Sequence, residues 1–126
     1  MSTNIIGWVE IYDEGGRHKW RGAIKIDYLL RQDYMAFGYL FGVTHEAVTD
    51  PIAARRGLPG DVSREARYGL DLDGYLDHSW ATWAEINASG WQNKKFTEDW
   101  WLLLEMVRLL AETYGDDGVR LVVAFV

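Results

Sequence analysis

The residues best suited to chemistry in this sequence form one short run, Asp77-His78-Ser79-Trp80. A serine nucleophile needs a histidine base within hydrogen-bond reach and a carboxylate behind that base. Neighbouring side chains on an extended chain point to opposite sides, so His78 is poorly placed to activate Ser79. The GxSxG turn that presents many nucleophilic serines is also absent. We therefore expect no catalytic triad, and keep as an alternative a small hydrolase or transferase with His78 as its general acid/base.

Two adjacent arginines, Arg55 and Arg56, stand in a segment bounded by Pro51 and Pro59. Guanidinium groups bind carboxylate and phosphate through parallel hydrogen bonds, so an arginine pair in a loop fits a small anion. We expect this segment to meet the His78 segment in space and to form one ligand-binding site with the start of the first helix. The residues assigned to that site are Arg31, Tyr34, Arg55, Arg56, Asp77, His78 and Ser79.

An acidic turn, Asp71-x-Asp73-Gly74-x-x-Asp77, has part of the spacing of a calcium loop. Its glycine comes too early, and no acidic residue follows at the twelfth position to bind the ion with both oxygens. Histidine pairs with HxH or HExxH spacing are absent as well. The sequence predicts a turn without a metal, and we expect no cofactor. Metal binding by these aspartates together with His78 stays open.

Aromatic side chains are numerous, with 7 Trp, 7 Tyr and 4 Phe in 126 residues. This is more rings than a small core requires, which implies that some of them line a surface. Trp91 lies in a polar segment, and Trp101 interrupts the polar side of an expected helix. Exposed tryptophans favour the binding of another protein, so Trp91 and Trp101 are the expected partner surface. The alternative is that each ring covers an edge of the core.

The composition restricts the class of protein. Acidic residues outnumber basic ones by 19 to 13, giving a formal net charge of −6, whereas binding along a nucleic-acid backbone needs a basic surface. The absence of cysteine excludes disulfides, zinc–thiolate sites and a cysteine nucleophile. No stretch approaches the roughly 20 apolar residues of a membrane span, and the first residues do not resemble a signal peptide. We expect one domain over residues 1–126, located in the cytoplasm.

Two alternating segments near the N-terminus, 5–13 and 20–27, predict a β-hairpin. The run Glu14-Gly15-Gly16 between them supplies the turn. Glu10 and Lys25 then become cross-strand partners of opposite charge.

A long helix over residues 97–114 is the strongest structural signal in the chain. Apolar residues from Trp100 to Tyr114 recur at positions that share one face of a helix. Thr97 stands at the N-cap, and Gly115 follows the last turn. Shorter helices are expected over 34–42 after an Asp27 or Asp33 cap, from Ser63, and from the Thr82–Glu85 capping box to Gly90.

The last eight residues, VRLVVAFV, have the composition of a strand that is buried on both faces. Residues 44–60 have no clear period and contain two prolines, which predicts a long ordered loop. We expect an α+β fold. In it, a small antiparallel sheet, made of the N-terminal hairpin and the C-terminal strand, packs against the long helix 97–114.

Three segments in the middle of the chain resemble a group of small uncharacterised proteins from bacteriophage and bacterial genomes. They are Arg31-Gln-Asp-Tyr34, the loop Pro51-Ile-Ala-Ala-Arg-Arg-Gly-Leu-Pro-Gly-Asp-Val-Ser63, and His78-Ser79-Trp80 ahead of a capped helix. The resemblance covers residues 28–88 and leaves out the flanking strands and the long helix. It implies a small accessory protein of phage type, in a family without an assigned activity. Asp77 departs from the family pattern, which weakens any metal site carried over from it.

These observations favour a small, non-catalytic accessory protein that binds a host protein or sequesters a small anionic ligand. One alternative is the enzyme that uses His78, and another is a structural or assembly component of a virion. The formation of a homo-oligomer is compatible with each of these functions. We expect no general nucleic-acid binding and no membrane partner.

Overall fold

The computed structural model describes residues 3–16, 19–27, 29–43, 50–70 and 77–126. The first part of the predicted loop 44–60 and most of the acidic turn, with Asp71 and Asp73, lie outside the described residues. The elements along the chain are β1 (Ile5–Tyr12), β2 (Trp20–Lys25), α1 (Tyr34–Phe41), α2 (Arg64–Leu70), β3 (Asp77–Thr82), α3 (Trp83–Ala88), a 3₁₀ turn η1 (Trp91–Asn93), α4 (Glu98–Tyr114) and β4 (Val119–Phe125).

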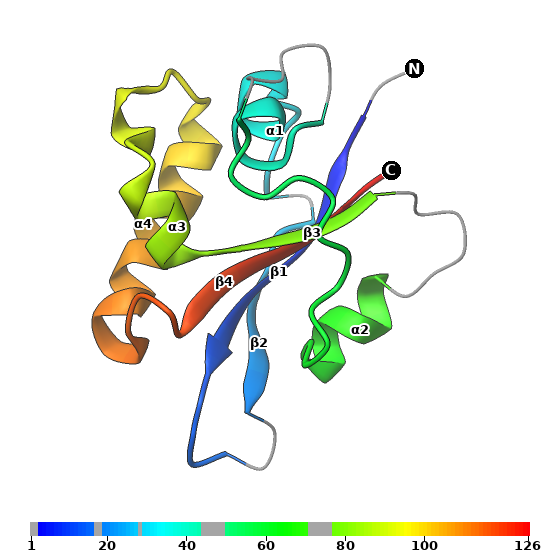
Figure 1. Ribbon diagram of the computed structural model, residues 1–126, viewed down its shortest axis with the longest axis vertical. Helices are drawn as coiled ribbons and strands as arrows, with labels where there is room; N and C mark the ends of the chain where they lie inside the picture. The colour runs from blue at the N-terminus through cyan, green and yellow to red at the C-terminus, as the bar shows by residue number, and fades with distance from the viewer. Residues whose placement is uncertain (1–2, 17–18, 28, 44–49, 71–76) are drawn as a thin grey trace.

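The four strands form one antiparallel sheet in the order β2-β1-β4-β3 (Figure 1). The predicted α+β class is confirmed, and β4 lies inside the sheet with every residue buried. Strand β3 is not predicted from the sequence, which treats residues 78–80 only as the entry to the helix that begins at Thr82. Four of its six residues are polar, and the segment becomes a strand by pairing with β4.

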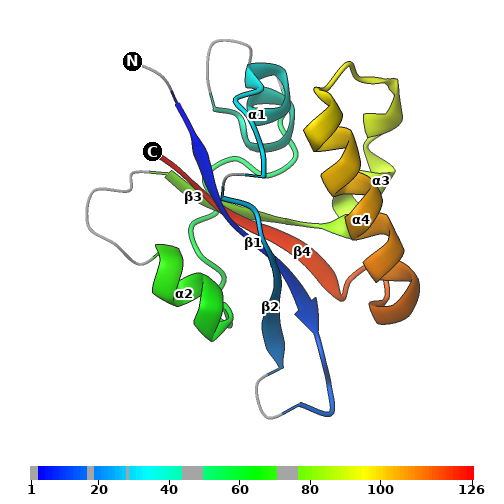
Figure 2. The same cartoon turned by 180° about the vertical axis from the view of Figure 1, so that it is seen from behind.

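Helices cover both faces of this sheet. On one face α1, α3 and α4 pack around residues such as Val9 and Leu121. On the other face α2 packs alone, with Leu70 against Val122. Figure 2, seen from behind, shows the same separation of α2 from the other helices. The sheet therefore has a large core on one side and a smaller one under α2.

Helix α4 follows its predicted pattern, but its start is held differently. Thr97 occupies the N-cap position, and its hydroxyl makes no capping hydrogen bond. The Thr97 N–H instead donates to Asp33 Oδ2 at 2.8 Å, while Asp33 Oδ1 accepts from the Ala36 N–H at 3.1 Å. One buried aspartate thus joins the starts of α1 and α4. The buried residues of α4 are Trp100, Leu103, Leu104, Val107 and Ala111.

The register of the hairpin differs from the expected one. A bulge between Val9 and Glu10 places Lys25 opposite Trp8 and Gly22 opposite Glu10. The predicted Glu10–Lys25 pair is therefore wrong. An inserted residue shifts the register beyond the bulge, and simple alternation does not reveal it.

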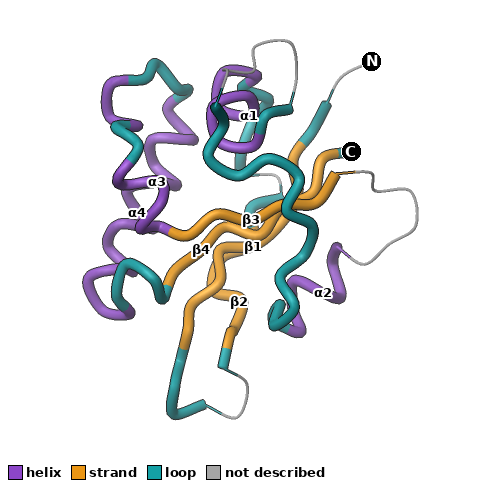
Figure 3. The backbone as a smooth tube through the Cα atoms, viewed as in Figure 1, coloured by secondary structure: helices purple, strands orange, loops and turns teal. Residues whose placement is uncertain are grey.

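The chain passes from one face of the sheet to the other along the edge of β3. Residues 50–63 connect α1 with α2 and run past that strand (Figure 3). Within this segment the Gly57 N–H donates to the carbonyl oxygen of His78 at 3.0 Å. The described part of the predicted long loop therefore packs against the sheet and covers an edge strand.

Among the described residues, no helix combines the length and the apolar character that crossing a membrane requires.

Candidate functional site

Arg56 is held by the chain on several sides. Its guanidinium binds Glu85 through two hydrogen bonds of 2.8 and 2.5 Å and also donates to the carbonyl oxygens of Ile52 and Trp80 at 3.0 and 3.2 Å. The hydrogen bonds from Arg56 outweigh the effect of burial and lower the pKa of Glu85 to about 2. Glu85 also completes the predicted capping box with Thr82. Arg56 therefore ties the loop to the first turn of α3.

Ser79 and His78 also serve the contact between this loop and β3. Ser79 is 2% exposed, and its hydroxyl donates to the Ala53 carbonyl at 2.5 Å and accepts the Arg56 N–H at 3.2 Å. The His78 Nε2 atom lies 2.9 Å from the carbonyl oxygen of Leu70. The arginine and His78 segments do meet, as expected. They meet through hydrogen bonds within the chain, and the Ser79 hydroxyl is not an accessible nucleophile.

The other predicted ligand-binding residues are dispersed. Arg55 lies 3.6 Å from the carboxylate of Asp77, with 80% of its side chain exposed. The backbone N–H of Arg31 donates to Asp99 in the first turn of α4. Tyr34 begins α1 and is 37% exposed. Joint binding of an anion by these residues stays a prediction.

Trp91 is completely buried. Its ring centre lies 4.7 Å from that of Trp101 and 5.9 Å from that of Trp83. The expected partner surface is therefore wrong for Trp91, because this ring fills the core between α3 and α4. Trp101 is partly buried against the same core.

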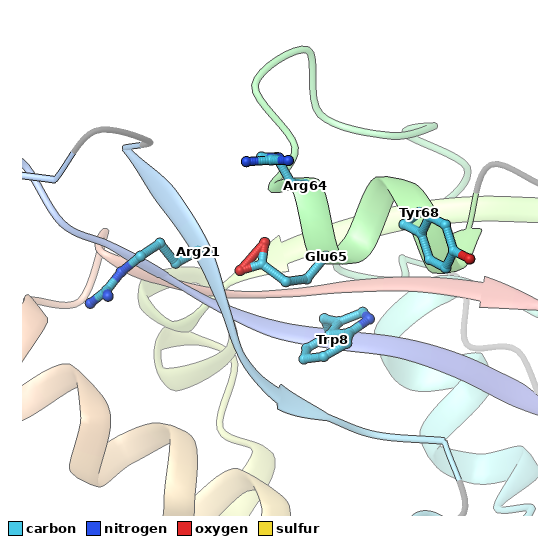
Figure 4. Close-up of a pocket in the computed structure, with 5 residues that line it drawn as sticks. All are labelled: Trp8, Arg21, Arg64, Glu65 and Tyr68. Carbon is cyan, nitrogen blue, oxygen red and sulfur yellow. The ribbon is translucent and has the colours of Figure 1, made fainter.

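A groove of about 560 Å³ lies between α2 and the strands β1 and β2. Trp8 of β1 and Arg21 of β2 line it, together with Arg64, Glu65 and Tyr68 of α2 (Figure 4). Tyr68 is 89% exposed. We name this surface the α2 groove.

Gly22 allows α2 to approach β2 closely. Its N–H donates to Glu65 Oε1 at 3.3 Å, and Figure 4 shows Glu65 pointing from α2 toward β2. A Cβ atom at position 22 would lie 2.8 Å from Trp8 Cε3 and 2.9 Å from Glu65 Cβ. Both distances are shorter than normal packing permits, so glycine sets the width of the groove.

A buried ion pair fixes the beginning of α2. Glu10 is fully buried and Arg120 is 4% exposed, and their Oε1 and Nε atoms are 2.6 Å apart. Arg120 also binds Asp61 at 3.0 Å, and its guanidinium carbon lies 3.7 Å from the ring centre of Trp20. The second Glu10 oxygen accepts the N–H of Ser63 at 2.7 Å. Ser63 caps α2, as predicted, so the ion pair anchors the groove to the sheet.

The sequence contains signals for this anchor. Arg120 is the single charged residue of VRLVVAFV, and a charge in a doubly buried strand requires a carboxylate partner. Glu10 stands in an apolar strand in the same way. The groove itself gives no comparable signal, because its residues come from three separate segments.

The described residues contain no group of three or more histidine, aspartate or glutamate side chains placed to hold a metal ion.

Comparison with protein-family models, with curated proteins and with solved structures finds no match to this chain.

Proposed function

We propose that this chain is a non-catalytic binding protein that engages another protein through the α2 groove. The observation that carries the proposal is the exposure of Tyr68, whose side chain is 89% exposed beside Trp8 and Arg64. Tryptophan, tyrosine and arginine are the residue types that contribute most binding energy at protein interfaces. Gly22 and the buried ion pair hold these side chains on a fixed framework, which reduces the entropy lost on binding.

A protein partner fits this surface better than a small molecule does. Small ligands usually bury 70–90% of their surface in a concave pocket. A ring as exposed as that of Tyr68 cannot enclose a small ligand. When a second protein covers the ring, a large apolar area is removed from water. Arg21, which also pairs with Asp13 at 3.2 Å, and Arg64 favour carboxylates on that partner, next to an apolar side chain that contacts Tyr68.

The proposed partner is a protein of the host cell, and the proposed place of action is the host cytoplasm. The resemblance of residues 28–88 to proteins of phage genomes supports this, since that segment includes all of α2. The burial of Ser79, whose hydroxyl binds the Ala53 carbonyl, agrees with a role in binding.

The test compares three immobilised proteins exposed to an extract of the host cell: wild type, Tyr68→Glu, and the control Met35→Glu. Met35 is 44% exposed on α1, away from the groove. A host protein should be retained by wild type and by the control and lost with Tyr68→Glu. Equal retention by all three, or retention by none, contradicts the proposal.

A further inference from the structure

The three most exposed large apolar side chains among the described residues lie on two different surfaces. Tyr68, at 89%, belongs to α2, whereas Leu102 and Leu109, at 54% each, belong to α4. Single exposed apolar side chains are normal on a protein surface, whereas those that stand in a regular pattern beside charged groups can mark a contact surface.

Helix α4 carries a regular pattern on its outer side. Glu98, Leu102, Glu105, Leu109 and Glu112 follow each other at alternating spacings of four and three residues, which places them in one line along the helix. Acidic and apolar residues therefore alternate over four turns. We name this line the α4 stripe.

The α4 stripe is negatively charged. Arg108 pairs with Glu105 at 2.9 Å and with Glu112 at 3.1 Å. One guanidinium cannot balance three carboxylates. Arg31 borders Glu98 and Leu102 at one end of the stripe, but Asp99 lies beside it as well. A partner for this surface must combine basic groups with an apolar side chain.

Helix α2 has the complementary chemistry. Arg64 and Arg67 flank Tyr68 on its outer side, while the one acidic residue, Glu65, turns toward β2. Leu102 and Leu109 are separated by two helical turns, about 10 Å, which leaves room for a ring between them. If the Tyr68 ring of one molecule lay between these two leucines of another, Arg64 and Arg67 would lie beside the glutamates of the α4 stripe.

We infer that the α2 groove of one copy binds the α4 stripe of a second copy. The two surfaces lie on opposite faces of the sheet (Figures 1 and 2), so they cannot meet within one molecule. Two α4 stripes facing each other would oppose carboxylate with carboxylate, which disfavours a symmetric pair. The contact is therefore head-to-tail, and each added copy leaves one free surface of each kind.

This inference rests on the proposed function, since it takes the α2 groove to be a protein-binding surface. Occupation of that groove by a second copy excludes a host protein from it. The two partners therefore compete for Tyr68.

A complementation experiment tests the head-to-tail contact. Tyr68→Glu disables the groove and leaves the stripe intact, whereas Leu109→Glu disables the stripe and leaves the groove intact. Both sites are exposed and glutamate is a good helix former, so both variants should keep the fold. Sedimentation velocity is recorded over a concentration series for wild type, for each variant, for their equimolar mixture and for Met35→Glu.

Wild type and Met35→Glu should grow into larger species with rising concentration, and growth should weaken with added salt. Each variant alone should associate with an affinity at least about 30-fold lower than that of wild type, as expected for a central interface residue. Their mixture should stop at a one-to-one pair, because it contains one intact groove facing one intact stripe.

The inference is overturned if wild type stays monomeric throughout, if either variant associates as wild type does, or if the mixture forms no pair. Host-protein capture separates this failure from that of the proposed function. If wild type stays monomeric and Tyr68→Glu still loses the host protein, only the contact between two copies is rejected, and host binding at the α2 groove stands. A Tyr68→Glu variant that retains both host binding and self-association rejects the groove itself.

Discussion

A guanidinium in a surface loop is commonly available to a ligand. The guanidinium of Arg56 instead makes hydrogen bonds within the chain that stabilise the fold. Its bonds to Glu85 and to the carbonyl oxygens of Ile52 and Trp80 join three segments. Sequence spacing gives the capping box at Thr82 and Glu85 correctly. It cannot show that Arg56 reaches the same carboxylate from 29 residues away.

Arg56→Ala should therefore destabilise the protein. We expect a loss of about 1–2 kcal/mol in the free energy of unfolding, less than for a fully buried pair because both side chains are partly exposed. Chemical denaturation measures this loss. Arg55→Ala is the matched control, since the side chain of Arg55 is 80% exposed, and it should change stability by no more than about 0.5 kcal/mol. An Arg56 variant as stable as the control would show that the Glu85 pair is unimportant.

The same pair predicts a pH dependence. The pKa of Glu85 falls from an ordinary 4.5 to about 2 in the folded protein. A carboxyl group with a lowered folded pKa stabilises the fold above its unfolded pKa, and this contribution disappears as the pH falls through the folded pKa. The stability difference between wild type and Arg56→Ala should therefore be full above pH 4.5 and should shrink toward pH 2. A difference that stays constant over this range argues against the ion pair.

Helices and strands with a complete local pattern are predicted well at the scale of elements. Helix α4 has an apolar stripe of five buried residues, and β4 is apolar throughout, so each is recognisable in isolation. Strand β3 is different. Its residues form a strand because β4 on one side and the loop 52–57 on the other satisfy its backbone, and neither neighbour is visible in the local sequence.

The α2 groove depends on the fit between two elements, which Gly22→Ala tests. The added methyl group meets Trp8 and Glu65 at less than 3.0 Å, so α2 must move away from β2. We expect a cost of roughly 1–3 kcal/mol, as for other overpacked contacts, together with weaker binding at the groove. Thermal melting and partner capture measure the two effects. Gly60→Ala is the control, because nothing lies within 4 Å of a Cβ there, and a similar loss in both variants contradicts a specific role for Gly22.

The main core provides a reference for these losses. Leu104 is fully buried on the inner side of α4, and Leu104→Ala should cost roughly 2–5 kcal/mol. This loss, read from thermal or chemical denaturation, should exceed that of Arg56→Ala. A Leu104 variant that melts like wild type would place α4 outside the cooperative core.

At the level of the whole molecule, a charged group on the central strand joins α2 to its face of the sheet. Arg120 stands on the central strand β4, and its contacts with Glu10 and Asp61 reach β1 and the segment before α2. Apolar contacts alone would allow α2 to shift along the sheet. The directional hydrogen bond from Ser63 to Glu10 defines one position for it.

Substitutions at this pair distinguish positioning of α2 from general stability. Arg120→Met leaves the Glu10 carboxylate buried without its partner and should cost about 3–5 kcal/mol. The double variant Glu10→Met/Arg120→Met removes both charges and should recover most of that loss, because an apolar pair of similar volume is often as stable. It also removes the acceptor for the buried Ser63 N–H, so the double variant should melt between Arg120→Met and wild type and should bind its partner more weakly at the α2 groove. Melting and binding that recover together would show that the ion pair stabilises the sheet without positioning α2.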